Sequence, residues 1–327
     1  MRLSKIGELS LLDVIRSKFA GGARDVIAGI GDDAAVVLPR DMPLLLTSDM
    51  MTEGIHFDLR FTTWFQVGYK IVSVNVSDIY AMGGIPRFML LNLAANENTD
   101  DRCIGCLLEG VRKALGAYLV RLVGGDLSSS KSGMTLSATL IGYAKKPVMR
   151  SGASPGDLVY VTGTLGDSAC GLNLLKRIGR PLSIETGERT DYPLGWKTAG
   201  PVLVRHLLPE ARKPGRITKV ATAMIDVSDG LLMDLSRLCE ESKVGTRIYM
   251  KRLPLSSQMR KIASELKIDP YTLATSGGED YELLFTAPPH RKVEAVCIGE
   301  ITRSGRVIIE TDGSKRTFSP EGYQHWH

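Results

Sequence analysis

The sequence predicts a mixed α/β (α+β) protein with two domains. Its 327 residues exceed the length that a single hydrophobic core usually organises. Short apolar segments of strand length alternate with longer segments in which apolar residues recur at helical spacing. Between residues 145 and 156, lysine, proline and glycine interrupt both patterns. We therefore expect a first domain over residues 1–145 and a second over residues 146–327.

The composition is that of an ordinary globular chain, 43% hydrophobic and 24% charged. Basic residues are scattered and aromatic residues make up only 6%, which argues against a nucleic-acid partner despite the net charge of +5. No run of about 18 apolar residues and no signal-peptide core is present. Five cysteines, an odd number, do not form a disulfide framework. We expect a cytoplasmic protein that does not bind membranes.

In the first domain, apolar residues over 6–19 follow helical spacing, and this helix should end at the two glycines 21 and 22. A second helix is predicted over residues 100–118. Short strands are indicated by β-branched and apolar runs beside turn residues. These strands cover residues 36–38, 44–47, 119–123 and 134–144, with a turn at 39–41 and the strand 119–123 ending at Gly124-Gly125-Asp126.

One segment of the first domain, residues 71–79, fits two patterns. Val72, Val74 and Val76 alternate as in a strand. Asn75, Asp78 and Met82, however, share one face of a helix. The residues by themselves leave this segment open.

The second domain shows the same alternation. Strands are predicted over 158–162 and 223–226, helices over 168–178 and after residue 230, and a glycine turn leads into a strand over 276–286. The helix after residue 230 should bury its leucines, with Asp229 capping its first amides. The polar residues 179–199, which include glycine and proline, predict an insertion or mobile loop.

Carboxylates beside small or hydroxyl residues recur next to apolar segments. They occur in GDD at 31–33, TSD at 47–49, NVSD at 75–78, VGGD at 123–126 and IDVSDG at 225–230. If the strands stop at these acids and lie side by side, the carboxylates gather at one edge and repel each other unless cations bind. Oxygen ligands favour Mg²⁺. One Asp-Gly turn alone is better explained as a turn or cap, but several together favour a metal site.

Four other motifs match known functional patterns less well. GIGDDA at 29–34 matches a dinucleotide-binding loop, but two aspartates there would repel a pyrophosphate. GDLSSSKS at 125–132 is one residue short of a P-loop and is better explained as a turn. Cys103 and Cys106 form a lone CxxC inside a helix, which favours buried structural thiols over zinc or redox chemistry. His325 and His327 favour a frayed terminus over a metal site.

Together these motifs resemble the thiamine-monophosphate kinase family from end to end. The matching segments are GELSLL at 7–12, GIGDDAAV at 29–36, TSDMMTEGIHF at 47–57, NVSDIYAMGGIP at 75–86, GGD at 124–126, RSGASPGD at 150–157, YVTGTLGDSACGL at 160–172, IDVSDGL at 225–231, SGGEDYEL at 276–283 and GYQHW at 322–326. The resemblance implies a two-domain fold like that of aminoimidazole ribonucleotide synthase. It also implies a helix at 75–84 and a homodimer whose first domains share a β-barrel.

The resemblance further implies that ATP phosphorylates thiamine monophosphate with Mg²⁺. The positions that match the family's magnesium ligands are Asp33, Thr47, Ser48, Asp49, Asp78, Asp126, Asp226 and Asp229. Those that match ATP-binding positions are Gly125, Asp126, Arg150 and Ser228. His56, Glu279 and Tyr323 match substrate-binding positions.

From this family match we expect Asp49, Asp126 and Arg150 to be the residues most directly involved in catalysis. The expected reaction is direct in-line transfer without a phosphoenzyme, since the acceptor is already an ionised phosphate. Two alternatives stay open at this point. One is an amide- or oxygen-activating ligase of the same superfamily, and the other is a nucleotide sensor without catalysis.

Overall fold

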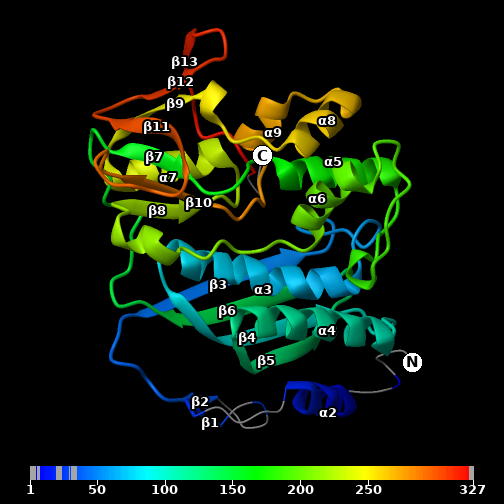
Figure 1. The fold of residues 1–327 in the computed structure, drawn as a ribbon. Helices are drawn as coiled ribbons and strands as arrows, with labels where there is room; N and C mark the ends of the chain where they lie inside the picture. The colour runs from blue at the N-terminus through cyan, green and yellow to red at the C-terminus, as the bar shows by residue number, and fades with distance from the viewer. Residues whose placement is uncertain (1–4, 6–7, 20–23, 29, 31–34, 324–327) are drawn as a thin grey trace. The chain divides into compact units, whose positions relative to one another are not determined.

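A computed structural model describes residues 5, 8–19, 24–28, 30 and 35–323. The chain divides into two compact units (Figure 1). Unit 1 comprises residues 1–79, 84–145 and 179–188, and unit 2 comprises residues 80–83, 146–178 and 189–327. Both units combine a β-sheet with helices, in agreement with the predicted α/β class.

The sheet of unit 1 has the strand order β3-β6-β4-β5. Its strands are β3 (Leu44–Thr52), β6 (Thr135–Tyr143), β4 (Ile85–Ala95) and β5 (Arg121–Ser129). Only β4 and β5 are parallel among these pairs. Helices α3 (Trp64–Ala81) and α4 (Asp101–Tyr118) lie over one face of the sheet (Figure 1). Alternate residues of β6, such as Leu136 and Leu140, are fully buried because successive side chains point to opposite faces.

The segment that fits both patterns in the sequence is helical, as the family resemblance implies. Ile71, Val72 and Val76 within α3 are all fully buried. Since α3 is buried on more than one side, its valines can alternate without forming a strand.

Two glycines bring α3 and α4 into close contact. A Cβ at Gly68 would lie 2.0 Å from the carbonyl oxygen of Leu107, and one at Gly110 would lie 1.9 Å from that of Phe65. Neither position has room for a side chain.

The opposite face of this sheet is partly covered by the strand pair β1 (Val26–Ala28) and β2 (Val36–Val37), of which Val26 and Val37 pack against Phe88 and Tyr143. Strand β2 therefore pairs with β1, whereas β3 pairs with β6. Arg87 donates to Asp25 and ties β1 to the sheet. The opening helix α2 (Glu8–Phe19) confirms the predicted helix.

The sheet of unit 2 has the strand order β13-β12-β9-β11-β7-β10-β8. Its strands are β7 (Leu158–Val161), β8 (Ala223–Asp226), β9 (Gly245–Tyr249), β10 (Leu283–Ala287), β11 (Val296–Thr302), β12 (Arg306–Ile309) and β13 (Lys315–Thr317). Its helices include α5 (Asp167–Ile178), α6 (Trp196–Leu207), α7 (Leu231–Ser242), α8 (Ser257–Leu266) and α9 (Pro270–Ser276). All four leucines of α7 are fully buried, which confirms that prediction.

Residues 179–188 pack on unit 1, although they follow α5 of unit 2. Nε2 of the buried Gln66 donates to the carbonyl oxygen of Leu182 at 2.6 Å and to Oε2 of Glu185 at 2.7 Å. The predicted loop 179–199 was wrong at its end, because α6 already begins at Trp196. None of the helices described here is both long and apolar enough to span a bilayer.

Candidate active site

Two of the sequence motifs lie side by side in unit 2. The amide of Glu279 donates to the carbonyl oxygen of Ser228 at 2.7 Å, and the amide of Tyr281 donates to that of Val227 at 2.9 Å. In return the amide of Val227 donates to the carbonyl oxygen of Glu282 at 2.8 Å. The SGGEDYEL segment is thereby held along the IDVSDGL segment.

The C-terminal motif joins the same place. The amide of Tyr323 donates to the carbonyl oxygen of Asp229 at 3.0 Å, and a Cβ at Gly322 would lie 2.4 Å from that oxygen. The side chain of Tyr323 is 43% exposed. The structure therefore brings together the segments that carry Ser228, Asp229, Glu279 and Tyr323, which come from three distant parts of the sequence.

The turn that carries Glu279 has an unusual backbone. Glu279 has φ 66° and Tyr281 has φ 50°, a left-handed conformation that side chains other than glycine rarely adopt. Gly278 precedes them, and a Cβ there would lie 2.5 Å from the carbonyl oxygen of Ser228. Such conformations persist where the surroundings enforce them, and they are frequent at functional sites.

The loop before α7 is held by a carboxylate that was not predicted from the sequence. Oδ2 of Asp234 accepts from the amides of Ser228 and Asp229 at 3.0 Å and from that of Gly230 at 3.2 Å. The prediction that Asp229 caps α7 is wrong, because Gly230 is the first flanking residue and has no side chain to accept with. A carboxylate one turn inside the helix reaches back to these amides instead.

Asp229 itself forms an ion pair. Nη1 of Arg237 lies 2.6 Å from Oδ2 of Asp229 and 2.9 Å from Oδ1 of Asp234. Burial and the charge of Asp229 raise the pKa of Asp234 to about 7, against the lowering effect of Arg237 and of the amide donors. Asp226, at the end of β8, is also buried and pairs in register with Leu283.

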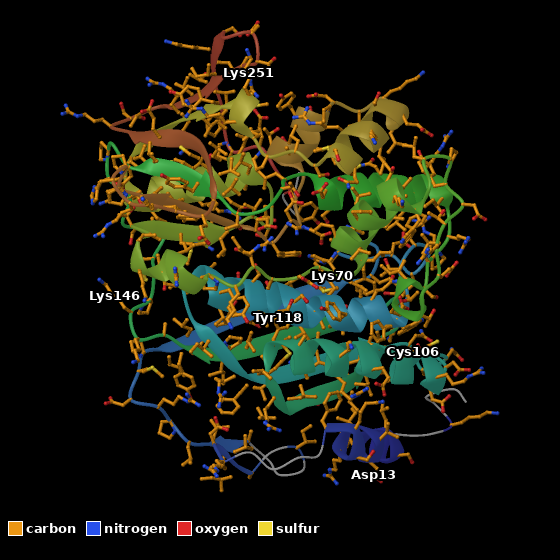
Figure 2. All side chains as sticks on the ribbon, in the orientation of Figure 1. Asp13, Lys70, Cys106, Tyr118, Lys146 and Lys251 are labelled. Atoms are coloured by element: carbon orange, nitrogen blue, oxygen red, sulfur yellow. The ribbon has the colours of Figure 1, made fainter. Side chains whose placement is uncertain are left out.

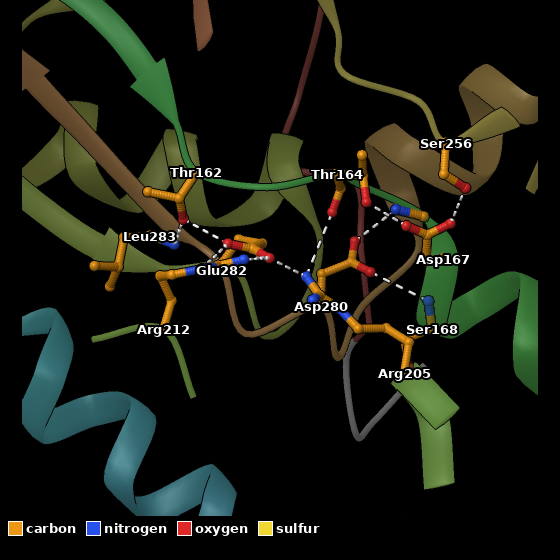
Figure 3. Close-up of polar contacts among 11 residues, drawn as sticks. Thr162, Thr164, Asp167, Ser168, Arg205, Arg212, Ser256, Asp280, Glu282 and Leu283 are labelled. Atoms are coloured by element: carbon orange, nitrogen blue, oxygen red, sulfur yellow. Dashed lines mark hydrogen bonds and ion pairs between the residues drawn. The ribbon is translucent and has the colours of Figure 1, made fainter. Parts of the chain in front are cut away.

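A buried polar network supports the SGGEDYEL segment from behind (Figure 3). Glu282, 1% exposed, accepts from Nε of Arg212 at 2.8 Å, from Thr162 at 2.6 Å and from Arg205. Burial alone would raise the pKa of Glu282, but its donors Arg212, Arg205 and Thr162 outweigh that and hold the pKa below its usual range.

Asp280 in the same segment caps the start of α5. It accepts from the amide of Gly166 at 2.6 Å and from that of Ser168 at 3.2 Å (Figure 3). Burial raises the pKa of Asp280 to about 7. The two acids on either side of Tyr281 are therefore structural, whereas Glu279 is partly exposed.

In unit 1, Thr47 on β3 donates a hydrogen bond to Asp78 on α3. Asp49 lies on the same face of β3 as Thr47, since it is two residues further along the strand. Ser48 faces the other way, where its hydroxyl donates to the carbonyl oxygen of Ala138 at 3.0 Å. The hydroxyls of Thr47 and Ser48 thus lie on opposite faces of the sheet.

Asp126 also lies on the face opposite to Asp49. In register, Asp126 pairs with Asn92, Asn92 with Ser137, and Ser137 with Met50, and residues paired in register share one face. The expectation that strands stop at these acids is wrong for both, because β3 continues to Thr52 and β5 to Ser129. Their cross-strand hydrogen bonds continue through the polar residues.

Within the described part of unit 1, the predicted metal ligands lie on both faces of the sheet. There, no three His, Cys, Asp or Glu side chains lie close enough to hold a metal ion together. Asp33, and most of the GIGDDA motif, lie outside the described residues.

Arg150 and His56, two further predicted site residues, lie outside the segments described above. The carbonyl oxygen of Arg150 accepts from Ser242 at the C-terminal end of α7, whereas Asp229 precedes the N-terminal end. A helix of this length spans about 18 Å, so Arg150 and Asp229 are not neighbours in unit 2. In unit 1, Nδ1 of His56 accepts from the amide of Thr52 at 3.1 Å, and Lys70 of α3 (Figure 2) donates to the carbonyl oxygen of His56.

The structure also tests two of the other motifs, the P-loop-like segment and the CxxC pair. Residues 125–129 are extended within β5, which is incompatible with a P-loop. Cys103 is half-buried and Cys106 is exposed on α4 (Figure 2), so the prediction of two buried thiols is wrong. The residues lie one helical turn apart, and Cys106 falls on the solvent side.

Comparison with known proteins follows the same division of the chain. The family described as AIR synthase related protein matches with its N-terminal domain over residues 31–144 and with its C-terminal domain over residues 154–312. Thiamine-monophosphate kinase of Aquifex aeolicus is 36% identical over 331 residues, which is 100% of both chains.

Solved structures give the same result. The structure of AaThiL complexed with AMPPCP and TMP has a TM-score of 0.77 at 36% identity and covers 100% of this chain and 99% of that chain. Thiamine-monophosphate kinase from Stenotrophomonas maltophilia K279a has a TM-score of 0.80 at 31% identity, covering 93% of this chain and 96% of that one. This chain therefore belongs to the thiamine-monophosphate kinase family, within the AIR synthase related proteins.

Proposed function

We infer that this chain is a kinase that transfers the γ-phosphoryl group of ATP to thiamine monophosphate, which yields thiamine diphosphate and ADP. The inference rests on similarity over the full length to thiamine-monophosphate kinases, one of which was solved with AMPPCP and TMP. The meeting of Ser228, Asp229, Glu279 and Tyr323 supports it, because three of the motifs behind the resemblance converge there.

The substrate roles follow from this assignment. Glu279 offers a partly exposed carboxylate to the cationic thiazolium or to the aminopyrimidine, and Tyr323 offers an aromatic face. His56 is the third substrate residue of this proposal. On the nucleotide side, Gly125, Asp126, Arg150 and Ser228 would bind ATP, with the Arg150 guanidinium as a planar phosphate donor.

The donor chemistry of the proposed ligands in each unit fits Mg²⁺. The proposed ligands Thr47, Asp49 and Asp78 in unit 1 and Asp226 and Asp229 in unit 2 offer only hydroxyl and carboxylate oxygens. Magnesium typically takes one or two protein carboxylates and completes its shell with water and phosphate oxygens. The full proposed set is Asp33, Thr47, Ser48, Asp49, Asp78, Asp126, Asp226 and Asp229. When bound, the metal would neutralise phosphate charge between donor and acceptor.

The protein's part in the reaction is alignment. The acceptor is an ionised phosphate monoester, so no strong general base is needed, and in-line transfer requires the two phosphates to be held end to end. Asp49, Asp126 and Arg150 are the proposed catalytic residues, and their charges would act on the metal and the phosphates. No side chain needs to accept the phosphoryl group covalently.

We further propose that the enzyme is a cytoplasmic homodimer, with a first domain over residues 1–145 that dimerises and a second over 146–327. Four apolar side chains on one face of the unit 1 sheet are largely exposed: Leu44 at 52%, Leu46 at 66%, Met50 at 59% and Ile85 at 58%. They share this face because Leu44 pairs in register with Tyr143 and Tyr143 with Ile85. A second copy would bury them.

The test is an assay with ATP, magnesium and thiamine monophosphate in which ADP and thiamine diphosphate are separated by chromatography. Equal amounts of both products are expected. ADP without thiamine diphosphate would point to an activating ligase, and ATP binding without turnover would point to a sensor. A labelled phosphoprotein formed with ATP alone would contradict direct transfer.

A further inference from the structure

His206 on α6 contacts the proposed substrate residue Glu279. Nδ1 of His206 lies 3.3 Å from Oε2 of Glu279 and 3.1 Å from Oγ of Ser168. The histidine side chain is 9% exposed, whereas that of Glu279 is 29% exposed. The pair therefore runs from the interior of unit 2 to its surface, with the carboxylate at the outer end.

The hydrogen on the imidazole decides which partner Nδ1 serves. An ionised carboxylate can only accept, so Nδ1 donates to Glu279 in the forms of the ring that carry a hydrogen on Nδ1, whereas Ser168 can donate to Nδ1 in the other tautomer. Ser168 is held on the other side, because its amide donates to Oδ1 of Asp280 at 3.2 Å. The charged groups near this contact are thus Glu279 itself, Asp280 behind Ser168, and Arg205 on the same helix, which is paired with Glu282.

The backbone leaves His206 little freedom to move. Val202, Leu203 and Leu207 on α6 are buried. A Cβ at Gly171 of α5 would lie 2.2 Å from the carbonyl oxygen of Val202 and 3.1 Å from Cβ of His206. The two helices are therefore packed closely at the position from which the imidazole reaches Glu279.

We propose that His206 is a positioning residue, which holds the Glu279 carboxylate in the orientation that binds the thiamine part of the substrate. This rests on the proposed function. Glu279 has three rotatable side-chain bonds, so a donor at its carboxylate reduces the number of orientations that the carboxylate samples. His206 acts on substrate binding and has no contact with the transferring phosphoryl group in this scheme.

The test compares His206→Leu, which removes the donor, with His206→Asn, whose amide nitrogen can occupy the position of Nδ1. His206→Leu is expected to raise KM for thiamine monophosphate about tenfold, the effect of losing one hydrogen bond to a charged group, with kcat and KM for ATP near wild type. His206→Asn should restore most of that loss. His290→Leu, at an exposed position, is the matched control and should leave all constants unchanged.

A double-mutant cycle makes the test specific to the pair. In a Glu279→Ala background, His206→Leu should have no further effect on KM. The inference is overturned if the two effects add, if kcat falls as much as kcat/KM, or if KM for ATP rises equally. If His206→Leu does not fold, His206→Gln takes its place, since its amide matches Nε2 and cannot donate from the Nδ1 position. A wild type that leaves thiamine monophosphate unchanged would overturn the proposed function as well.

Discussion

Nη1 of Arg237 lies 2.6 Å from Oδ2 of Asp229, the carboxylate proposed to bind magnesium at the start of α7. The same nitrogen lies 2.9 Å from Asp234, whose other oxygen accepts from the backbone of the loop. Two residues one turn apart on α7 therefore hold Asp229: Arg237 binds its side chain and Asp234 binds its backbone amide. Asp234 is the residue on which this arrangement depends.

Replacing Asp234 by alanine should therefore destabilise the fold. The amides of Ser228, Asp229 and Gly230 would lose their acceptor and Arg237 would lose a partner, at a cost of roughly 3 kcal/mol or more. Urea unfolding measures this. Glu240→Ala on the same helix, where an exposed glutamate pairs with Arg306, is the control and should cost less than about 1 kcal/mol. Equal costs would contradict the role of Asp234.

Acid sensitivity should trace in part to Glu282. Its pKa in the folded chain lies below the ordinary 4.5, so its stabilising contribution is present above pH 4.5 and is lost as pH falls through the folded value. The melting temperature of the wild type should fall more steeply between about pH 5 and pH 3 than that of Glu282→Gln, because only the wild type takes up this proton on unfolding. Parallel curves would show that the Glu282 network does not contribute.

Two glycines of α4 should respond in opposite ways to alanine. Gly110→Ala places a Cβ 1.9 Å from the carbonyl oxygen of Phe65 and should destabilise by about 1–3 kcal/mol. Gly105→Ala meets nothing within 4 Å and should stabilise by about 0.5–1 kcal/mol, since alanine is the better helix former. Chemical unfolding of both variants decides this. A destabilised Gly105→Ala would show that α4 is packed differently.

Asp49→Asn should reduce turnover by roughly 10² to 10³ while leaving the fold intact, because it removes a charge from the proposed metal shell and keeps the shape of the side chain. Steady-state rates over a magnesium titration measure it. Near-normal turnover at saturating magnesium would remove Asp49 from that shell.

The proposed dimer can be tested on β3. Leu46→Asp puts a charge in the exposed apolar face of the unit 1 sheet and should give a monomer in light scattering after size-exclusion chromatography. Leu119→Asp, at an even more exposed leucine at the end of α4, should keep the assembly state of the wild type. A dimer that survives Leu46→Asp would place the interface elsewhere.

Much of the fold could be predicted because strands and helices were marked by apolar periodicity and by turn residues. The helix α3 could not be predicted from periodicity, because it is buried on several sides and its valines fit both the strand period and the helix period. The ends of β3 and β5 could not either, because Asp49 and Asp126 continue the cross-strand pairing in spite of their charge. Polarity marks the end of a strand only when its neighbours also end.

The site residues that stand in recognisable sequence motifs could be predicted, whereas those that act only through contacts with other segments could not. Ser228, Asp229, Glu279 and Tyr323 stand in motifs with recognisable neighbours. Asp234 and His206 stand inside helices. A carboxylate among leucines and a single histidine are the only sequence features that could have indicated their supporting roles. The supporting residues become visible only once α6, α7 and the SGGEDYEL segment are placed together.

The packing of residues 179–188 on unit 1 has a consequence for how the chain is made. The buried amide nitrogen Nε2 of Gln66 donates to Leu182 and Glu185, which are synthesised after β7 and α5 of the other unit. At 5–20 residues per second, they follow residue 145 by roughly 2 to 8 seconds. A fragment that stops at residue 145 would leave Gln66 without these acceptors, so nascent unit 1 is completed only while unit 2 is already emerging from the ribosome.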